Sequence, residues 1–218
     1  MINRVLIALL LLVLHGNADA QAWRGDDSEG PVIFYLHGQI IENEGPTPVH
    51  PRWGLYDYPA ILEALRSRGA RVESEERARS TNIYEYAGVV INQIERLIAS
   101  GVAPERIVVV GFSKGGAIMI HVSSFLRRNE IRYVPLAACS DWLENNPHLQ
   151  LTGRVFSIYE NSDDLAGSCQ HFNNKNNELV SFRELATDTG KEHGAFYLPR
   201  DEWVVPLLDW IDAASEPE

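Results

Sequence analysis

Short apolar runs alternate with longer stretches of helical periodicity through most of the chain. The runs are too short for helices and predict strands at 32–36, 70–75, 106–111, 133–138, 154–159 and 179–185. Apolar residues at three- and four-residue spacing predict helices at 57–68, 82–100, 114–127 and 201–214. Strands that alternate with helices are typical of βαβ units. We therefore expect an α/β fold, with a mostly parallel sheet and helices on both of its faces.

Two segments have clear hydrophobic patterns, and a third has the composition of a loop. The sequence RIVVVG at 106–111 predicts a central strand that is buried on both faces. The helix predicted at 82–100 is expected to end just before Gly101, since glycine is the residue that most often follows the last turn of a helix. The stretch 39–55 contains three prolines and two glycines, and it predicts a long surface loop.

The first twenty residues have the pattern of a targeting segment rather than of a folded element. Arg4 precedes an unbroken apolar run from Val5 to Leu14, which is about half the roughly 20 residues that span a bilayer. Ala18-Asp19-Ala20 supplies a cleavage pattern of small residues. We therefore predict a signal peptide at 1–20 and a mature domain at 21–218, exported to the periplasm or the extracellular space, with no membrane attachment after cleavage.

Composition and charge restrict the possible partners. The chain has 218 residues, of which 45% are hydrophobic and 22% charged, as in ordinary globular proteins of one domain. Its formal net charge is −11 and it has no basic run, so binding to nucleic acid or to an anionic membrane is not expected. No H-E-x-x-H or C-x-x-C spacing occurs, and we expect neither a metal nor another cofactor.

The two cysteines allow more than one interpretation. Cys139 and Cys169 both remain in the mature chain, and an even cysteine count in an exported protein is compatible with one disulfide. Two separate buried thiols are the alternative. A catalytic cysteine is the least favoured interpretation, since neither residue stands in a recognisable nucleophile context.

The segment Gly111-Phe112-Ser113-Lys114-Gly115-Gly116 carries the strongest chemical signal. It matches G-x-S-x-G at the junction of the predicted central strand and the following helix. A serine on such a sharp turn is held outward at the end of the sheet, and only glycines let the neighbouring backbone come close enough. A glycine-rich turn without chemistry is the alternative. A phosphate loop is disfavoured because G-x-x-x-x-G-K-[ST] is absent.

This motif gives the sequence a resemblance to the α/β-hydrolase family, specifically to its small lidless carboxylesterases and dienelactone-hydrolase-like members. The resemblance also rests on Leu36-His37-Gly38 after the first strand and on Pro104-Glu105-Arg106 before the central one. It covers nearly all of the mature chain and implies a single-domain α/β-hydrolase fold. Only thirteen residues separate Ser140 from Arg154, where many relatives insert a helical cap, so we expect no cap domain and an open cleft.

The resemblance implies a catalytic triad in the chain order serine, acid, histidine. Ser113 is the expected nucleophile and His193, between the last strand and the last helix, is the expected general base. The acid is expected after the strand at 154–159, where Asp163 fits the spacing best and Asp164 is the alternative. Asp141 would serve in a variant topology. The alternative for His193 is an exposed loop histidine.

The resemblance also implies two backbone donors for an oxyanion hole. Lys114, the residue after the nucleophile, supplies one N–H, and Gln39 supplies the other unless it is an ordinary loop residue. His37 is expected to organise this loop by hydrogen bonding. Glu160 stands where the family usually has glycine before the acid, which is a departure from the family's strand-G-x-x-D pattern.

These residues predict an exported serine hydrolase that cleaves a small ester through an acyl-enzyme intermediate. A serine peptidase of the same fold and a catalytically inactive binding protein are the alternatives. Trp53 and its neighbouring prolines could wall a substrate pocket or belong to an unstructured surface loop. Arg71, Arg77 and Arg79 could bind a substrate carboxylate, but the interleaved glutamates favour a solvated charged face.

Overall fold

The computed structural model describes residues 30–175 and 178–213. The predicted signal peptide at 1–20 lies outside these residues. Within them, no helix is long and apolar enough to cross a membrane.

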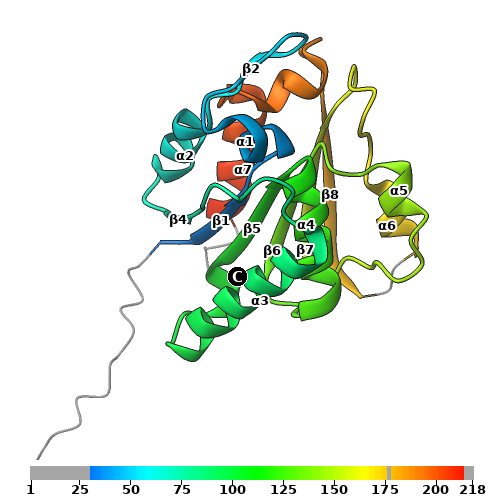
Figure 1. Ribbon diagram of the computed structural model, residues 1–218. Helices are drawn as coiled ribbons and strands as arrows, with labels where there is room; N and C mark the ends of the chain where they lie inside the picture. Colours follow the sequence, from blue (N-terminus) through cyan, green and yellow to red (C-terminus); the bar gives the residue numbers. More distant parts are fainter. Residues whose placement is uncertain (1–29, 176–177, 214–218) are drawn as a thin grey trace, which may run out of the picture.

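A single six-stranded parallel sheet forms the centre of the molecule (Figure 1). Its order is β4-β1-β5-β6-β7-β8. The strands are β1 (Val32–Leu36), β4 (Arg71–Glu73), β5 (Ile107–Phe112), β6 (Arg132–Leu136), β7 (Gly153–Glu160) and β8 (Leu179–Thr187). Every residue of β5 is buried, so the prediction of a central strand covered on both faces is confirmed.

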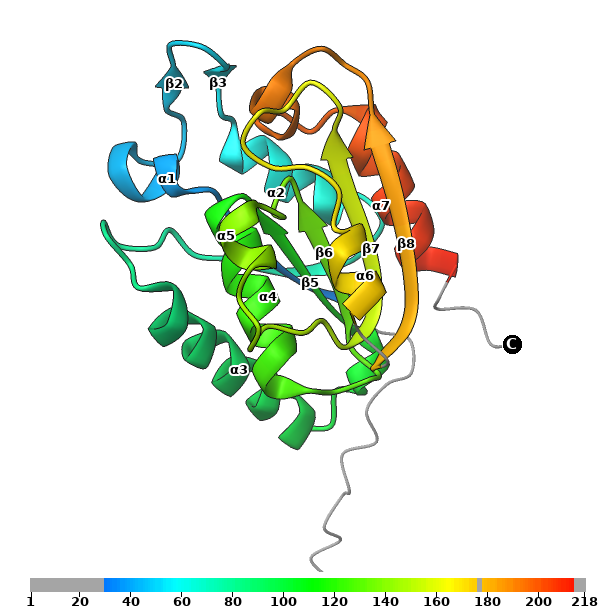
Figure 2. The same cartoon turned by 90° about the vertical axis from the view of Figure 1, so that its right-hand side faces the viewer.

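Helices cover both faces of the sheet (Figure 2). The helices α2 (Tyr58–Arg66) and α7 (Asp201–Ala213) pack on one face, where Ile61, Leu65 and Trp203 enter one hydrophobic cluster. The helices α3 (Ile83–Ala99) and α4 (Lys114–Leu126) pack on the other face, which has its own cluster. The predicted architecture of a parallel sheet between helices is confirmed, and residues 30–175 and 178–213 form no cap domain.

Local sequence explains where the helices begin. The side chain of Asp57 accepts a hydrogen bond from the backbone N–H of Ala60 and caps α2, whose second residue is Pro59. The side chain of Asn82 accepts hydrogen bonds from two backbone N–H groups in the first turn of α3. These caps satisfy donors that have no partner within a helix.

The stretch 39–55 is not the loop that its prolines and glycines predict. It forms the helix α1 (Gln39–Glu44) and a hairpin of β2 (Val49–His50) and β3 (Gly54–Leu55). The prolines lie between these elements rather than within them, and Gly45 and Gly54 take the positive φ values, 86° and 81°, that the turns require. Elements this short cannot establish a period of their own.

Other short elements also carry no sequence pattern of their own. They are α5 (Asp141–Glu144), α6 (Gln170–Lys175) and the single turns η1 (Pro104–Arg106) and η2 (Glu192–Phe196).

A disulfide joins Cys139, after β6, to Cys169, before α6, with a Cα–Cα distance of 5.3 Å. This is the first of the interpretations that the two cysteines allow, and it fastens the segment that follows β7 to the end of β6.

Candidate active site

Ser113 lies on a strained turn between β5 and α4. Its φ of 53° and ψ of −119° are outside the regions that residues with a Cβ normally occupy. The turn is possible because neighbouring backbone segments nearly touch: a Cβ on Gly115 would lie 1.9 Å from the carbonyl oxygen of Leu36. Ser113 makes no side-chain hydrogen bond to cap α4, which leaves its Oγ atom directed to other partners.

Three of the predicted residues meet in one hydrogen-bonded chain. His193 Nε2 lies 2.9 Å from Ser113 Oγ, and His193 Nδ1 lies 2.7 Å from Asp163 Oδ2. The three side chains follow β5, β7 and β8, whose carboxyl ends share one edge of the parallel sheet. Because an ionised carboxylate only accepts hydrogen bonds, Nδ1 carries the hydrogen and Nε2 is free to accept the Ser113 hydroxyl proton.

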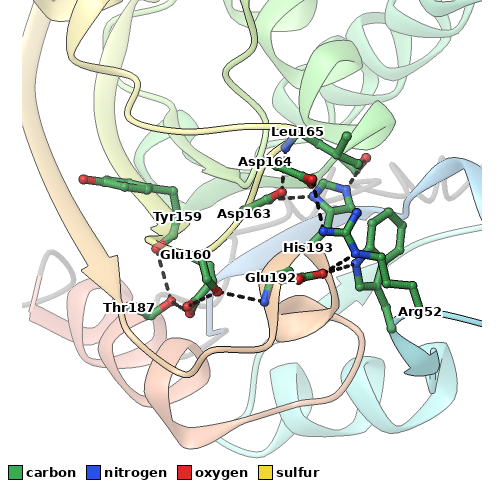
Figure 3. A network of polar contacts seen from close by, with 12 residues as sticks. Arg52, Tyr159, Glu160, Asp163, Asp164, Leu165, Thr187, Glu192 and His193 are labelled. Atoms are coloured by element: carbon green, nitrogen blue, oxygen red, sulfur yellow. Dashed lines mark hydrogen bonds and ion pairs between the residues drawn. The ribbon is translucent and has the colours of Figure 1, made fainter.

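The two alternative acids lie elsewhere. The Asp164 carboxylate pairs with Arg52, with 3.0 Å between Oδ2 and Nη2 (Figure 3). Asp141 is exposed at the start of α5. Asp163 therefore has the geometry expected of the acid, and its side chain is fully buried against the histidine ring.

Gln39 and Lys114 occupy matching positions at the site. Each is the first residue of a helix, α1 and α4 respectively, so its backbone N–H has no partner within that helix. Both residues line the cavity that contains Ser113. The positions expected for the two oxyanion donors are thus next to the nucleophile.

A buried cluster of charges lies behind these two residues. Glu42, on α1, accepts hydrogen bonds from Arg77 Nε at 2.8 Å and from Lys114 Nζ at 2.5 Å. The side chains of Glu42 and Arg77 are 0% and 1% exposed. The pairing of Glu42 with Lys114 fastens α1 to the start of α4, and therefore joins the two helices that begin at Gln39 and Lys114.

His37 completes this cluster. Its Nε2 accepts the backbone N–H of Arg77 at 3.0 Å, and its Nδ1 donates to the Gly38 carbonyl at 2.8 Å. Burial, with the Arg77 charge in addition, lowers the pKa of His37 to about 3, so the ring stays neutral. His37 does organise this loop by hydrogen bonding, as the sequence predicts.

The three arginines near β4 contribute to structure. Arg77 is buried among protein groups, so it belongs neither to a substrate-carboxylate site nor to a solvated face. Arg71 pairs with Glu73 on the surface, and Arg79 donates to the carbonyl oxygen of Asn43. The cluster of Glu42, Arg77 and Lys114 has no sequence signal, because its members come from three separate segments.

Glu160 holds the other side of the site together (Figure 3). As the last residue of β7, it accepts hydrogen bonds from the hydroxyls of Ser162 and Thr187, both at 2.8 Å, and from the backbone N–H and hydroxyl of Thr189. Burial raises the pKa of this carboxyl, but these hydrogen bonds outweigh burial and lower the pKa to about 2. The Ser162 hydroxyl also accepts the backbone N–H of Glu192, beside His193.

The β2–β3 hairpin is attached to the loop after β7 and to the loop after β8. Arg52 pairs with both Asp164 and Glu192, and the indole N–H of Trp53 donates to Glu192 at 3.0 Å (Figure 3). The ring of Trp53 lies 5.3 Å from that of His193, centroid to centroid. A segment expected to be loop thus places an aromatic ring against the histidine.

Two cavities open onto Ser113. The larger has a volume of about 480 Å³, and the smaller about 410 Å³. Both fall within the range of small-molecule sites. They share Gln39, Ser113, Leu165 and His193. The part of the chain that the structure describes contains no group of His, Cys, Asp and Glu side chains able to hold a metal ion.

Comparison with known proteins finds one matching family and several structures of similar fold. Residues 70–161 match the family described as phospholipase/carboxylesterase. A lidless α/β serine hydrolase from Xanthomonas campestris is 13% identical, covers 84% of this chain and 79% of its own, and has a TM-score of 0.53. A putative α/β hydrolase from Agrobacterium tumefaciens is 16% identical, covers 84% and 85%, and has a TM-score of 0.56.

A third similar structure is α/β hydrolase domain-containing protein 10 from mouse. It is 14% identical, covers 84% of this chain and 90% of its own, and has a TM-score of 0.57. No curated protein sequence matches significantly. At these identities the structures establish a common fold, and the family match adds the sequence around β5 and Ser113. The chain therefore has the fold of the α/β hydrolases, and its residues 70–161 match the phospholipase/carboxylesterase family.

Proposed function

We propose that this member of a hydrolase family of the phospholipase/carboxylesterase type is an exported serine esterase for small esters. The observation that carries the proposal is the hydrogen-bonded chain from Ser113 through His193 to Asp163, at the junction of two cavities. A nucleophile, a base and an orienting carboxylate are the groups that acyl transfer to serine requires.

The first half of the reaction transfers the acyl group to the enzyme. Ser113 Oγ forms a bond to the ester carbonyl carbon while its proton passes to His193 Nε2, and the carbonyl electrons move to oxygen. Asp163 stabilises the resulting imidazolium, and the N–H groups of Gln39 and Lys114 stabilise the oxyanion. The bond to the alcohol oxygen then breaks, that oxygen takes the proton from Nε2, and the acyl group remains on Ser113.

The second half releases the acid. Water gives a proton to His193 Nε2 and adds to the acyl carbon, which recreates the oxyanion between Gln39 and Lys114. The bond from this carbon to Ser113 Oγ breaks, and Oγ recovers the proton. The products are the alcohol and the carboxylic acid, with the enzyme unchanged.

Export is the second part of the proposal. The pattern of residues 1–20 supports it, because a short positive region, an apolar run and a small-residue cleavage site follow in order. The pairing of Cys139 with Cys169 also supports it, since disulfides persist in oxidising compartments. A cell fractionation that finds the protein uncleaved in the cytoplasm would contradict this part alone.

The catalytic part is tested with a fluorophosphonate, which reacts only with an activated serine. We expect intact mass to show one adduct on the parent protein and none on Ser113→Ala, with turnover of p-nitrophenyl acetate reduced at least about a thousandfold. Ser67→Ala, an exposed serine at the end of α2, is the matched control and keeps both properties. An unlabelled but folded parent contradicts the proposal, and faster cleavage of peptide anilides than of esters indicates a peptidase.

A further inference from the structure

The two cavities that meet at Ser113 have different walls. The larger is lined by residues of α3, α4 and the segment after β6, including Ile83, Ala117 and Trp142. The smaller is lined by residues of α1 and the β2–β3 hairpin and by aromatic rings: His50, Trp53, Phe112 and Tyr197. An ester has an acyl part and an alcohol part on either side of its carbonyl carbon. Each cavity can therefore receive one of them.

The position of His193 distinguishes the two cavities. In the proposed reaction the alcohol oxygen must lie beside His193 Nε2, because it takes its proton from that atom. Trp53 and Phe112 pack directly on the His193 ring, with centroid distances of 5.3 and 4.9 Å. Both residues line the smaller cavity and neither lines the larger. The alcohol therefore belongs in the smaller cavity and the acyl group in the larger.

The walls of the smaller cavity indicate the kind of alcohol. His50 and Trp53 stack with their ring centroids 4.1 Å apart and their planes 15° from parallel, and Tyr197 meets Trp53 edge-on at 5.9 Å. Aromatic walls in these orientations favour a planar ring, which can add a stacked or edge contact of the same kind. Exposed Glu44 at the margin disfavours an anionic group.

The aromatic wall is held in place before any substrate binds. The Trp53 indole N–H donates to Glu192, the residue immediately before His193. On the other side of His193, a Cβ on Gly194 would lie 2.7 Å from the Cβ of Trp53, so the two backbones are in close contact. Trp53 and the histidine loop thus form one unit, and little order needs to be gained when a ring binds.

We propose that the smaller cavity is a subsite for a neutral aromatic leaving alcohol of the benzyl type, with Trp53 as the residue that determines this specificity. The proposal rests on the proposed esterase function. It assigns a role to the hairpin that neither the fold nor the triad geometry requires.

The experiment compares three acetates: benzyl, cyclohexylmethyl and allyl. Benzyl and allyl alcohols have nearly equal acidity, and the cyclohexyl ring is apolar without being planar. We expect kcat/KM of the wild type to be about tenfold higher for benzyl acetate than for the other two. Trp53→Leu should lose this preference and Trp53→Phe should keep most of it.

The matched control makes the same substitution in the other cavity. Trp142→Leu should change kcat/KM for all three acetates by one common factor, because the acetyl group is the same in each. Equal wild-type rates for benzyl and cyclohexylmethyl acetates overturn the proposal, as does an unchanged benzyl preference in Trp53→Leu. If the wild type reacts with neither the fluorophosphonate nor any acetate, the esterase function itself fails. Labelling of Ser113 without a benzyl preference refutes the subsite alone.

Discussion

The two sides of Ser113 are held in place by different kinds of polar network. On the oxyanion side (His37, Glu42, Arg77 and Lys114), one buried carboxylate pairs with two cations. On the acid–histidine side (Glu160, Ser162, Thr187 and Thr189), one buried carboxylate is held by hydroxyls and backbone N–H groups, with no cation among them. Each network joins segments that are far apart in the sequence.

The difference follows the charges of the proposed reaction. The oxyanion side has one more positive than negative charge, close to where the carbonyl oxygen becomes negative. On the acid–histidine side, the carboxylate of Asp163 lies 2.7 Å from His193 Nδ1, on the ring that becomes positive. The network there adds the buried carboxylate of Glu160, which is joined through Ser162 to the residue before His193. Fixed charges of opposite sign to the developing ones lower the barrier without rearrangement. The charge of each network is therefore opposite in sign to the charge that develops beside it in the proposed reaction.

Removal of the Glu42 charge should have the largest effect. Glu42→Gln leaves Arg77 as a buried cation without an anionic partner, and breaking a buried pair in this way costs about 3–5 kcal/mol. We expect a loss of that size in the free energy of unfolding, measured by urea denaturation at pH 7.

Glu44→Gln is the control for this variant. It removes the same charge from the same helix at an exposed position, and the free energy of unfolding should change by less than about 0.5 kcal/mol. Equal losses in the two variants would show that the buried pairing does not hold the oxyanion side together.

The two sides should respond to acid in different pH ranges. The unfolded chain protonates His37 below its ordinary pKa of 6.5, while the folded chain does so only near 3, so stability falls as the pH drops below 6.5. Glu160 adds a second decrease below its ordinary pKa of 4.5, because its folded pKa is about 2. Each group contributes up to about 1.4 kcal/mol per pH unit in its range.

Two variants separate these contributions when the midpoint of urea unfolding is measured from about pH 7.5 to about pH 3. His37→Gln should flatten the decrease in this midpoint between about pH 6.5 and 4.5. Glu160→Gln should keep that decrease and lose the additional one below 4.5. Identical pH profiles for the wild type and both variants would show that neither network controls acid stability.

The groups at the strand ends could be predicted from sequence because their signals are local. Ser113 follows a buried strand and begins a helix, and G-x-S-x-G reports the close backbone contact that Gly115 makes with Leu36. Asp163 and His193 follow strands that the apolar runs identify, and parallel strands bring such residues to one edge. The choice between Asp163 and Asp164 needed the structure, since the two residues are adjacent in sequence.

The supporting residues could not be predicted because their partners are distant in sequence. Glu42 is 35 and 72 residues from its partners Arg77 and Lys114. Glu160 departs from the family's glycine, but only the fold brings Thr187 and Thr189 to it. These contacts produce no periodicity and no motif. In the sequence, a buried charged residue of this kind cannot be distinguished from a charged surface residue.

The smallest effect is expected from the ion pairs of Arg52, which provide the exposed counterpart of the buried pairs of Glu42. Arg52 and Asp164 are 47% and 57% exposed, and such pairs contribute little to stability because water and salt screen them. We therefore expect Arg52→Ala to lower the free energy of unfolding far less than Glu42→Gln does, with less effect still in about 0.5 M salt, where screening is stronger. A loss as large as that of Glu42→Gln would mean that the hairpin is fastened by its charges. The small loss means that packing of Trp53 on the His193 loop fastens it instead.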